Sequence, residues 1–543
     1  MGWGAALALC IGATQLGPLG SSDLFWHLAC GRVILAERTL PPRDPLTHTA
    51  GDRAWPHHEW GAQVALAATD RALGLWGLRG LRALLVALTL LGVAWLLASH
   101  TRSPAVEVAG VLLAWVGMAP FAAMRPSLFG WAALVWILAL LTPPRPWRTW
   151  RYLAVAAAVV IWVNVHTSAL ILSVLVGAQL AGAVVEQAWR RRWTPGALVH
   201  WGLLFGIVSL AALVQPEGIG LYRYALAAPE INRELSTDWW PLLRADVWWA
   251  HPAVLLLFIG LSGAVVGLGV TRRGRESVPE HRFPGFWVAV AALLLAANTR
   301  RMSFLAFLPL IYVARSLGDA PWAVSARERA GHLSPVTAHL VAGGLLAAGM
   351  ILSLPTDGGG VLRPEPLRAG RFPVAATRFL AATRLQGALY NPPSWGGYLA
   401  YRLYPEYRTF IDGRWLVVGR RVLRDSRRLR YRRRDVTPLV HRYHLAVFIQ
   451  PTQEMLRWPP LPRASWRLAY ADPRAVVLVR RGPRYATNRD RICAWYRAQP
   501  GRRVHARWPL RLGPGSGRAT ATDIRPVMDD CPAGPSNVRG PGG

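Results

Sequence analysis

The sequence predicts a polytopic α-helical membrane protein that carries a C-terminal, water-facing α/β domain. Three observations indicate this class: 52% of the 543 residues are hydrophobic, only 17% are charged, and 27 are tryptophan. The sequence contains no lysine, so all 62 basic residues are arginine. Disordered, collagen-like and disulfide-rich chains have different compositions and are excluded.

The net charge of +33 is distributed unevenly and divides the chain into parts. Residues 1–354 hold 27 arginines against 17 acidic residues, whereas residues 355–543 hold 35 arginines against 12. We therefore expect a transmembrane body over 1–354 and a basic α/β domain over 355–509. The tail, residues 510–543, is rich in glycine and proline and is predicted to be disordered.

Hydropathy predicts about eleven transmembrane helices. A helix needs roughly 20 apolar residues to cross a hydrocarbon core of about 30 Å. Stretches that reach or approach this length lie at residues 3–20, 81–99, 104–124, 127–142, 152–163, 169–185, 197–214, 253–271, 284–298, 303–318 and 336–354. The stretches 152–163 and 284–298 are short, so we expect them to merge with neighbouring residues or to lie tilted.

Arginine placement predicts the orientation of these helices, because cytoplasmic loops carry an excess of basic residues. The short loops with clustered arginines include Arg148, Arg191, Arg273 and Arg327. We expect a multi-pass protein of the cytoplasmic (inner) membrane with a cytoplasmic N-terminus. The loops 21–80 and 215–252 and the C-terminal domain then lie outside the cytoplasm. Arg125, Arg300 and Arg301 depart from the rule, since they fall at the outer ends of spans.

The C-terminal domain shows short alternating helices and strands. We expect helices at 373–384 and 395–403 and strands at 387–390, 408–411, 445–450, 466–471 and 475–480. The last two strands read as a hairpin that turns at Asp472-Pro473.

The first outer loop places a carboxylate soon after the first membrane span. Asp23, followed by Trp26 and His27, suits a general base that takes a proton from an acceptor hydroxyl at the membrane–water boundary. The run Ser21-Ser22-Asp23 also suits a helix N-cap, so the residues alone leave both interpretations open. Further polar candidates in this loop are Asp44, His57, His58 and Glu59. The adjacent histidines match no metal-ligand spacing.

A set of segments, taken in order, carries a family resemblance. The segments are DLFWHLACGR (23–32), LPPRDPLTHT (40–49), HHEW (57–60), MRPSLF (124–129), WVNVHTS (162–168), QPEG (215–218), NTRRMSF (298–304) and the segment 391–414. They resemble a bacterial group in the GT-C glycosyltransferase superfamily, which includes protein O-mannosyltransferases and the catalytic subunit of oligosaccharyltransferase. The resemblance covers roughly residues 20–430.

The resemblance implies inverting transfer of a sugar from a polyprenyl-phosphate carrier, with Asp23 as the base. Breaking the sugar–phosphate bond leaves negative charge on the carrier, and guanidinium groups bind phosphate bidentately. We therefore expect Arg125, Arg300 and Arg301 to bind the donor phosphate, together with His166. Lipid head groups are the alternative partners of these arginines. The first outer loop contains no D-x-D motif, which leaves a divalent metal (Mg²⁺ or Mn²⁺) open.

Other polar and aromatic residues are candidates for substrate binding. They are His27, His58, Glu59, Asn164, Glu234, Asp238, Trp395 and Tyr398. Tryptophans in the loop 215–252 are also typical of a membrane interface. SWGGY at 394–398 resembles only faintly the acceptor-binding tryptophan motif of oligosaccharyltransferase, because Gly-Gly replaces the acid. Asp412-Gly413-Arg414 is interpreted as a turn.

Cysteines and the arginine run 424–434 indicate the compartment and its anions. Cys493 and Cys531 both fall on the predicted outer side, where a disulfide between them is one option. The arginine run would suit nucleic acid, but an outer location favours anionic lipid or glycan as its partner.

The predicted function is transfer of a hexosyl or pentosyl group from a polyprenyl-phosphate-sugar donor to a glycan, lipid or protein acceptor. The first alternative is a transporter or flippase of lipid-linked sugars, which predicts internal repeats that the sequence does not show. The second is a non-catalytic membrane scaffold that binds anionic surface polymers. A lipid-linked polymer ligase or polymerase is the third, and it would carry its long loop between late spans.

Overall fold

The computed structural model of the chain describes residues 2–100, 104–142, 147–191, 193–235, 237–244, 252–272, 283–318, 344, 365–368, 370–431, 436–455, 461, 465–498, 527 and 531. The chain divides into two compact units. Unit 1 contains residues 1–21 and 56–367, and unit 2 contains residues 22–55 and 368–543. Residues 22–55, which we expected to belong with the transmembrane body, are thus grouped with the C-terminal part of the chain.

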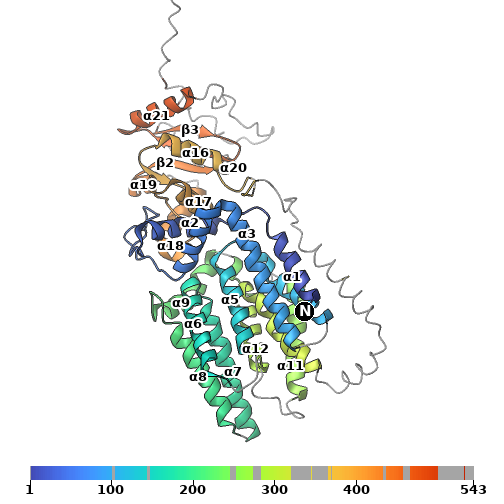
Figure 1. Cartoon of the computed structure of the whole chain (residues 1–543). Helices are drawn as coiled ribbons and strands as arrows, with labels where there is room; N and C mark the ends of the chain where they lie inside the picture. The colour runs from blue at the N-terminus through green and yellow to red at the C-terminus, as the bar shows by residue number, and fades with distance from the viewer. Residues whose placement is uncertain are drawn as a thin grey trace, which may run out of the picture. The chain divides into compact units, whose positions relative to one another are not determined.

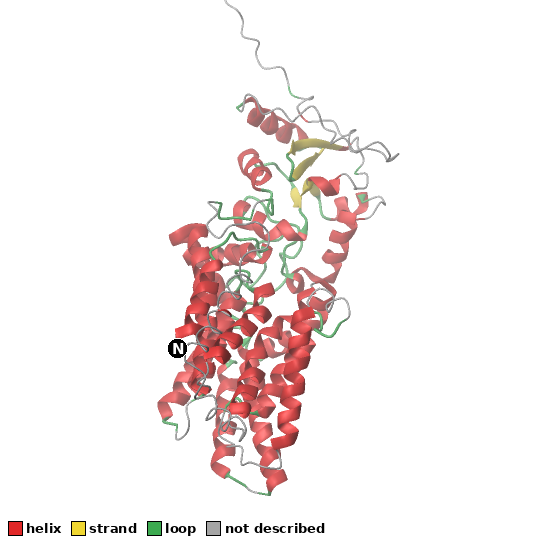
Figure 2. Cartoon of the chain, turned by 90° about the vertical axis from the view of Figure 1, so that its right-hand side faces the viewer, coloured by secondary structure: helices red, strands yellow, loops and turns green. Residues whose placement is uncertain are grey.

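Unit 1 is a bundle of apolar helices that run side by side (Figures 1 and 2). Its described helices are α1 (Gly2–Thr14), α3 (Trp60–His100), α4 (Pro104–Met118), η1 (Ala119–Phe121), α5 (Pro126–Leu141), α6 (Thr149–Val165), α7 (Ala169–Arg190), α8 (Pro195–Ala211), α9 (Gly220–Leu235), η2 (Thr237–Trp239), α11 (Pro252–Arg272), α12 (Phe286–Asn298), η3 (Arg300–Ala306) and α13 (Phe307–Gly318). Proline begins several of them, where its missing N–H and fixed φ cost nothing.

Most predicted spans coincide with these helices, but some bounds differ. α3 begins at Trp60 rather than near residue 81, and it bends at Gly74, whose φ is 61°. The span predicted at 336–354 lies outside the described residues. Among the described helices, only α3 and residues 169–189 are both long and apolar enough to cross a membrane unaided. The number of eleven crossings therefore stays a prediction.

Large apolar side chains remain exposed on the outside of the bundle. Leu153, Ile161, Val199, Leu210 and Leu256 are each at least 65% exposed. Soluble proteins seldom expose so many apolar groups together, because water contact with them is unfavourable. Exposed apolar side chains of this kind are expected on helices that face lipid.

Unit 2 combines helices with a four-stranded sheet. Its described elements are α2 (Ser22–Glu37), α16 (Val374–Thr383), β1 (Ala388–Tyr390), α17 (Pro393–Leu403), α18 (Trp415–Tyr431), α19 (Thr437–Arg442), β2 (Leu445–Pro451), α20 (Thr452–Met455), β3 (Trp466–Ala471), β4 (Ala475–Arg480) and α21 (Tyr485–Arg497). The strand order is β1-β2-β4-β3, with β1 parallel to β2 and the other pairs antiparallel. The β3–β4 hairpin turns at Asp472 as predicted, since its Oδ1 accepts the N–H of Ala475 at 2.7 Å.

The strand predicted at 408–411 does not form. Thr409 makes one isolated bridge with Thr47, and its N–H donates to Leu46 O at 2.9 Å. The pairing partner comes from the 22–55 segment, and the bridge does not extend into a ladder.

The arginine run forms part of helix α18. Val417, Val418, Val422, Leu423 and Leu429 are its buried apolar residues. Its exposed arginines are Arg420, Arg421, Arg424, Arg427 and Arg428. Residues 432–434, which continue the run, lie outside the described residues.

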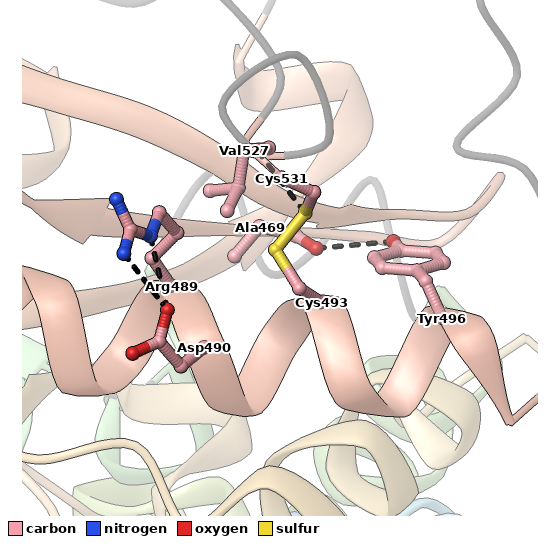
Figure 3. Close-up of a disulfide and its surroundings, with 7 residues drawn as sticks. All are labelled: Ala469, Arg489, Asp490, Cys493, Tyr496, Val527 and Cys531. Atoms are coloured by element: carbon pink, nitrogen blue, oxygen red, sulfur yellow. Dashed lines mark hydrogen bonds and ion pairs between the residues drawn. A yellow bond between two sulfur atoms is a disulfide. The ribbon is translucent and has the colours of Figure 1, made fainter. Parts of the chain in front are cut away.

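The disulfide left open by the sequence is present between Cys493 and Cys531, whose Cα atoms lie 5.7 Å apart (Figure 3). Cys493 belongs to α21, which also contacts the sheet: the Tyr496 hydroxyl donates to Ala469 O at 3.0 Å. Most of the tail 510–543 lies outside the described residues.

Candidate active site

A hydrogen-bond network around Asn164 in unit 1 joins three segments that are far apart in the sequence. The Trp60 indole N–H, at the start of α3, donates to Asn164 Oδ1 at 2.8 Å. The Asn164 amide then donates to Val160 O in its own helix α6 and to Val214 O beyond α8, at 2.9 and 2.8 Å. A β-carbon at Gly61 would stand 2.9 Å from Asn164 O, so glycine permits this close approach.

The QPEG segment (215–218) is hydrogen-bonded to the segment that carries His57 and His58. The backbone N–H of His57 donates to Glu217 Oε1 at 2.9 Å. The Glu217 N–H donates to Gln215 Oε1 at 2.7 Å, and the Gln215 amide donates to Gly218 O at 2.7 Å. Glu217 was not predicted as a site residue, and its only signal was its place in a segment of the family resemblance.

His166 follows α6 and connects a hydroxyl to a carboxylate. Its Nδ1 accepts the backbone N–H of Ser168 at 3.0 Å, and the Ser168 hydroxyl lies 2.7 Å from the same nitrogen. Trp162 Nε1 donates to that hydroxyl at 3.2 Å. Because Nδ1 is an acceptor, the ring proton of neutral His166 is on Nε2, which lies 3.3 Å from Glu59 Oε1.

Burial keeps both histidines of this cluster neutral at physiological pH. Burial, with the positive charge of Arg301 and the nearby His58, lowers the pKa of His166 to about 3. Burial and the adjacent His57 lower the pKa of His58 to about 4. Desolvation disfavours the charged imidazolium, so Arg301 supplies the permanent positive charge of this network.

His58 lies between a carboxylate and a phenol ring. Its Nε2 is 4.0 Å from Glu59 Oε2, and its ring lies tilted against Tyr224 at 4.3 Å between centroids. Its buried Nδ1 has no hydrogen-bond partner in the described part of the chain. We call His58, Glu59, His166, Tyr224 and Arg301 the polar cluster of unit 1.

The remaining predicted phosphate-binding arginines lie in an adjoining network. Arg125 Nη1 is 3.3 Å from Asp238 Oδ2, and both side chains are partly exposed. The Thr299 hydroxyl donates to Asp238 O at 3.2 Å, and Arg300 N–H donates to Trp240 O at 3.0 Å. Arg301 lies 5.2 Å from the centre of the Trp239 ring. Glu234 is exposed on α9.

These groups occupy the same end of the unit 1 bundle. They lie where α6, α8 and α12 end and where α3, α5 and α7 begin. Arg148 precedes α6 and Arg191 follows α7, so both lie at the opposite end of these helices. The separation agrees with the predicted sidedness of the arginines.

Asp23 lies in unit 2, in the first turn of α2. A β-carbon at Gly413 would stand 2.8 Å from Asp23 Oδ1 and 2.9 Å from Trp26 Nε1. His27 is 3% exposed, and its ring lies tilted against Trp26 at 3.4 Å between centroids. The carboxylate thus lies against the Asp412-Gly413-Arg414 turn.

Trp395 and Tyr398 lie in the core of unit 2. They are 1% and 3% exposed. The Trp395 indole donates to Arg371 O at 3.3 Å, and Tyr398 stacks on Phe372 at 5.0 Å between centroids. Their observed contacts are packing contacts within the unit.

Unit 2 contains a buried ion cluster that was not predicted from the sequence. Arg414 Nη1 contacts Asp44 Oδ1 at 2.8 Å, and its Nη2 contacts Asp412 Oδ2 at 2.6 Å. All three side chains are at most 4% exposed. No group of three or more His, Cys, Asp or Glu residues suited to a metal occurs among the described residues. The divalent metal stays an open expectation from the sequence.

Comparisons with known proteins bear on the fold. No family model matches the sequence, and the comparison with curated proteins finds no significant match. The apo oligosaccharyltransferase of Archaeoglobus fulgidus is similar with a TM-score of 0.52 and 11% identity, over 83% of this chain and 70% of that chain. The same enzyme tethered by a disulfide to an acceptor peptide with the NVT sequon gives 0.49 and 10%, over 83% and 69%.

A third similar structure is ArnT from Cupriavidus metallidurans bound to undecaprenyl phosphate, with a TM-score of 0.47 and 15% identity, over 89% of this chain and 98% of that chain. At these identities the likeness to the archaeal enzyme concerns the fold. The chain shares the fold of the archaeal oligosaccharyltransferase, a fold that agrees with the resemblance of the sequence segments.

Proposed function

We propose that this protein transfers a sugar from a polyprenyl-phosphate carrier to an acceptor hydroxyl at the outer face of the cytoplasmic membrane. Asp23 takes the proton of the acceptor hydroxyl, whose oxygen attacks the anomeric carbon from the face opposite the phosphate. The bond between sugar and phosphate oxygen breaks, and the polyprenyl phosphate leaves as an anion. Arg301, Arg300 and Arg125 bind that anion through their guanidinium groups.

The observation that carries the proposal is the polar cluster of unit 1. HHEW and WVNVHTS resemble the superfamily separately, yet their side chains bond to one another at one end of the bundle. QPEG joins them through Glu217, and Arg301 of NTRRMSF lies close enough to lower the pKa of His166. Buried ionisable groups in a membrane protein indicate function, because their desolvation is costly. The GT-C fold supports glycosyl transfer in general.

The geometry also refines the proposed role of His166. Its Nε2 faces Glu59 and its Nδ1 accepts from Ser168, so both ring nitrogens have protein partners. We assign His166 to holding Glu59 beside Arg301, and the arginines to the phosphate itself.

Lipid mass spectrometry of a deletion strain tests the function. We expect a polyprenyl-phosphate-linked sugar to accumulate, and the wild-type chain to restore its consumption. Asp23→Asn should accumulate the same lipid while keeping normal expression and membrane insertion. An unchanged lipid profile in the deletion strain contradicts the proposed donor. Full complementation by Asp23→Asn contradicts the base and favours a flippase or a scaffold.

A further inference from the structure

Asp23 lies in a close-packed setting made by two glycines of unit 2. At Gly397, in α17, a β-carbon would stand 2.8 Å from Ser22 O and 2.9 Å from Trp26 N, so this glycine lets α17 contact the first turn of α2. At Gly413 the corresponding atoms are Asp23 Oδ1 and Trp26 Nε1, at 2.8 and 2.9 Å. Distances below 3.0 Å essentially never occur for real β-carbons. A β-carbon at Gly397 would displace backbone, so that position requires glycine, whereas a β-carbon at Gly413 would displace the ends of the Asp23 and Trp26 side chains.

The two glycines contact different parts of α2. Gly397 meets backbone atoms and so fixes where the helix begins. A β-carbon at Gly413 would meet the carboxylate oxygen itself, so the missing side chain of this glycine leaves the space in which the charged end of Asp23 lies. A side chain added at residue 413 would therefore displace the carboxylate oxygen that is proposed to take the proton.

The turn that carries Gly413 is held on both sides. Arg414 binds Asp412 through Nη2 at 2.6 Å and Asp44 through Nη1 at 2.8 Å. Asp44 Oδ1 also accepts the N–H of Leu46 at 3.0 Å. On the other side, the fully buried Asn391 donates to Ile411 O at 2.8 Å. A guanidinium fork between two buried carboxylates fixes backbone geometry more strictly than a single contact.

We infer that Gly413, held in place by Arg414, is a positioning residue that sets the location of the Asp23 carboxylate. The inference rests on the proposed function, in which Asp23 is the base. A general base must lie within hydrogen-bond reach of the proton it removes, and a displacement of about 1 Å can lower the rate about a hundredfold. The added methyl of Gly413→Ala requires the carboxylate to retreat from 2.8 Å toward an ordinary contact beyond 3.4 Å.

The test compares Gly413→Ala with Gly482→Ala, using the full-length protein in nanodiscs. Gly482 is exposed in the same unit, and a β-carbon there meets nothing within 4 Å. Turnover is measured with the lipid-linked sugar that accumulates in the deletion strain. Binding is measured by native mass spectrometry with undecaprenyl phosphate as the probe. We expect Gly413→Ala to lose roughly ten- to a hundredfold in turnover with unchanged probe binding and melting temperature, and Gly482→Ala to behave as wild type.

A second set of variants separates positioning from structure. In an Asp23→Asn background, Gly413→Ala should cause little further loss of the residual rate, because both changes act through one carboxylate. Arg414→Lys keeps the charge but not the fork, so it should lower turnover in the same direction even if Gly413→Ala does not fold.

The outcomes distinguish the two proposals. Wild-type turnover by a folded Gly413→Ala, with Asp23→Asn inactive, overturns the positioning role and leaves the function standing. An equal fractional loss in the wild-type and Asp23→Asn backgrounds also overturns it. If the wild-type protein does not consume the lipid-linked sugar, the proposed function itself fails.

Discussion

His166 illustrates how a residue at the boundary of a membrane helix is held in one protonation state. Its Nδ1 accepts from Ser168, so its proton is on Nε2, facing Glu59. A neutral imidazole contributes no net charge, whereas arginine stays ionised at any physiological pH. The charge that a carrier phosphate would meet in this cluster therefore comes from Arg301.

Replacing Arg301 should remove phosphate binding without unfolding the bundle. We expect Arg301→Gln to weaken binding of undecaprenyl phosphate about tenfold or more, because hydrogen bonds to charged groups contribute about 1.5–3 kcal/mol. Native mass spectrometry in nanodiscs measures the bound fraction. Arg148→Gln, at the opposite end of α6, is the matched control. Equal binding by both variants would contradict the role of Arg301.

The histidines of the cluster predict a loss of stability in acid. The pKa of His58 is about 4 in the folded protein and about 6.5 in an unfolded chain. Between these values the unfolded state binds the extra proton, so stability is fully present above pH 6.5 and falls as the pH drops toward 4. The shift of about 2.5 pKa units corresponds to about 3 kcal/mol.

Melting temperatures of the nanodisc-bound protein between pH 7.5 and 4 check this prediction. His58→Gln should show a shallower decline than the wild type, because its side chain does not titrate. A wild-type profile that stays flat down to pH 4 would rule the prediction out.

Among the elements, α21 is the one that a covalent bond fixes to a distant segment. The disulfide spans 38 residues of sequence, and closing a loop of that length restricts the unfolded chain by about 4 kcal/mol in the entropic account. Cys531→Ser should therefore lower the melting temperature of the protein. Cys10 forms no disulfide, so Cys10→Ser should leave the melting temperature unchanged. An unchanged melting temperature in Cys531→Ser would contradict the stabilising role of the disulfide.

Elements with local signals were predictable, and those completed by distant partners were not. β3 and β4 follow each other around Asp472, so their alternation and turn were visible in the sequence. Thr409 pairs with Thr47 across more than 360 residues, which no local pattern reveals. In the candidate site, the position of Asn164 and His166 at one end of the bundle could be predicted from where the apolar helix ends. The Glu59–His166 contact and the Asp44–Arg414–Asp412 cluster depend on how the chain folds back.

For the molecule as a whole, the expected orientation places unit 2 outside the cytoplasm. A disulfide is typical of proteins on that side, because cytosolic thiols are usually kept reduced. We predict that a membrane-impermeant maleimide labels Arg481→Cys in intact cells but labels Arg148→Cys only after permeabilisation. Arg481 and Arg148 are both exposed, so access to the side chain itself is matched. The reverse labelling pattern would invert the topology.

The composition of unit 2 from two separate stretches has a consequence for biosynthesis. Residues 22–55 leave the ribosome early, but their partners begin only at residue 368. At 5–20 residues per second, the intervening stretch of about 310 residues takes roughly 15–60 s to synthesise. During that interval α2 and Asp44 lack their contacts with the C-terminal stretch, among them the ion pair of Asp44 with Arg414. We expect chaperones or the membrane surface to protect residues 22–55 from aggregation until the last third of the protein is translated.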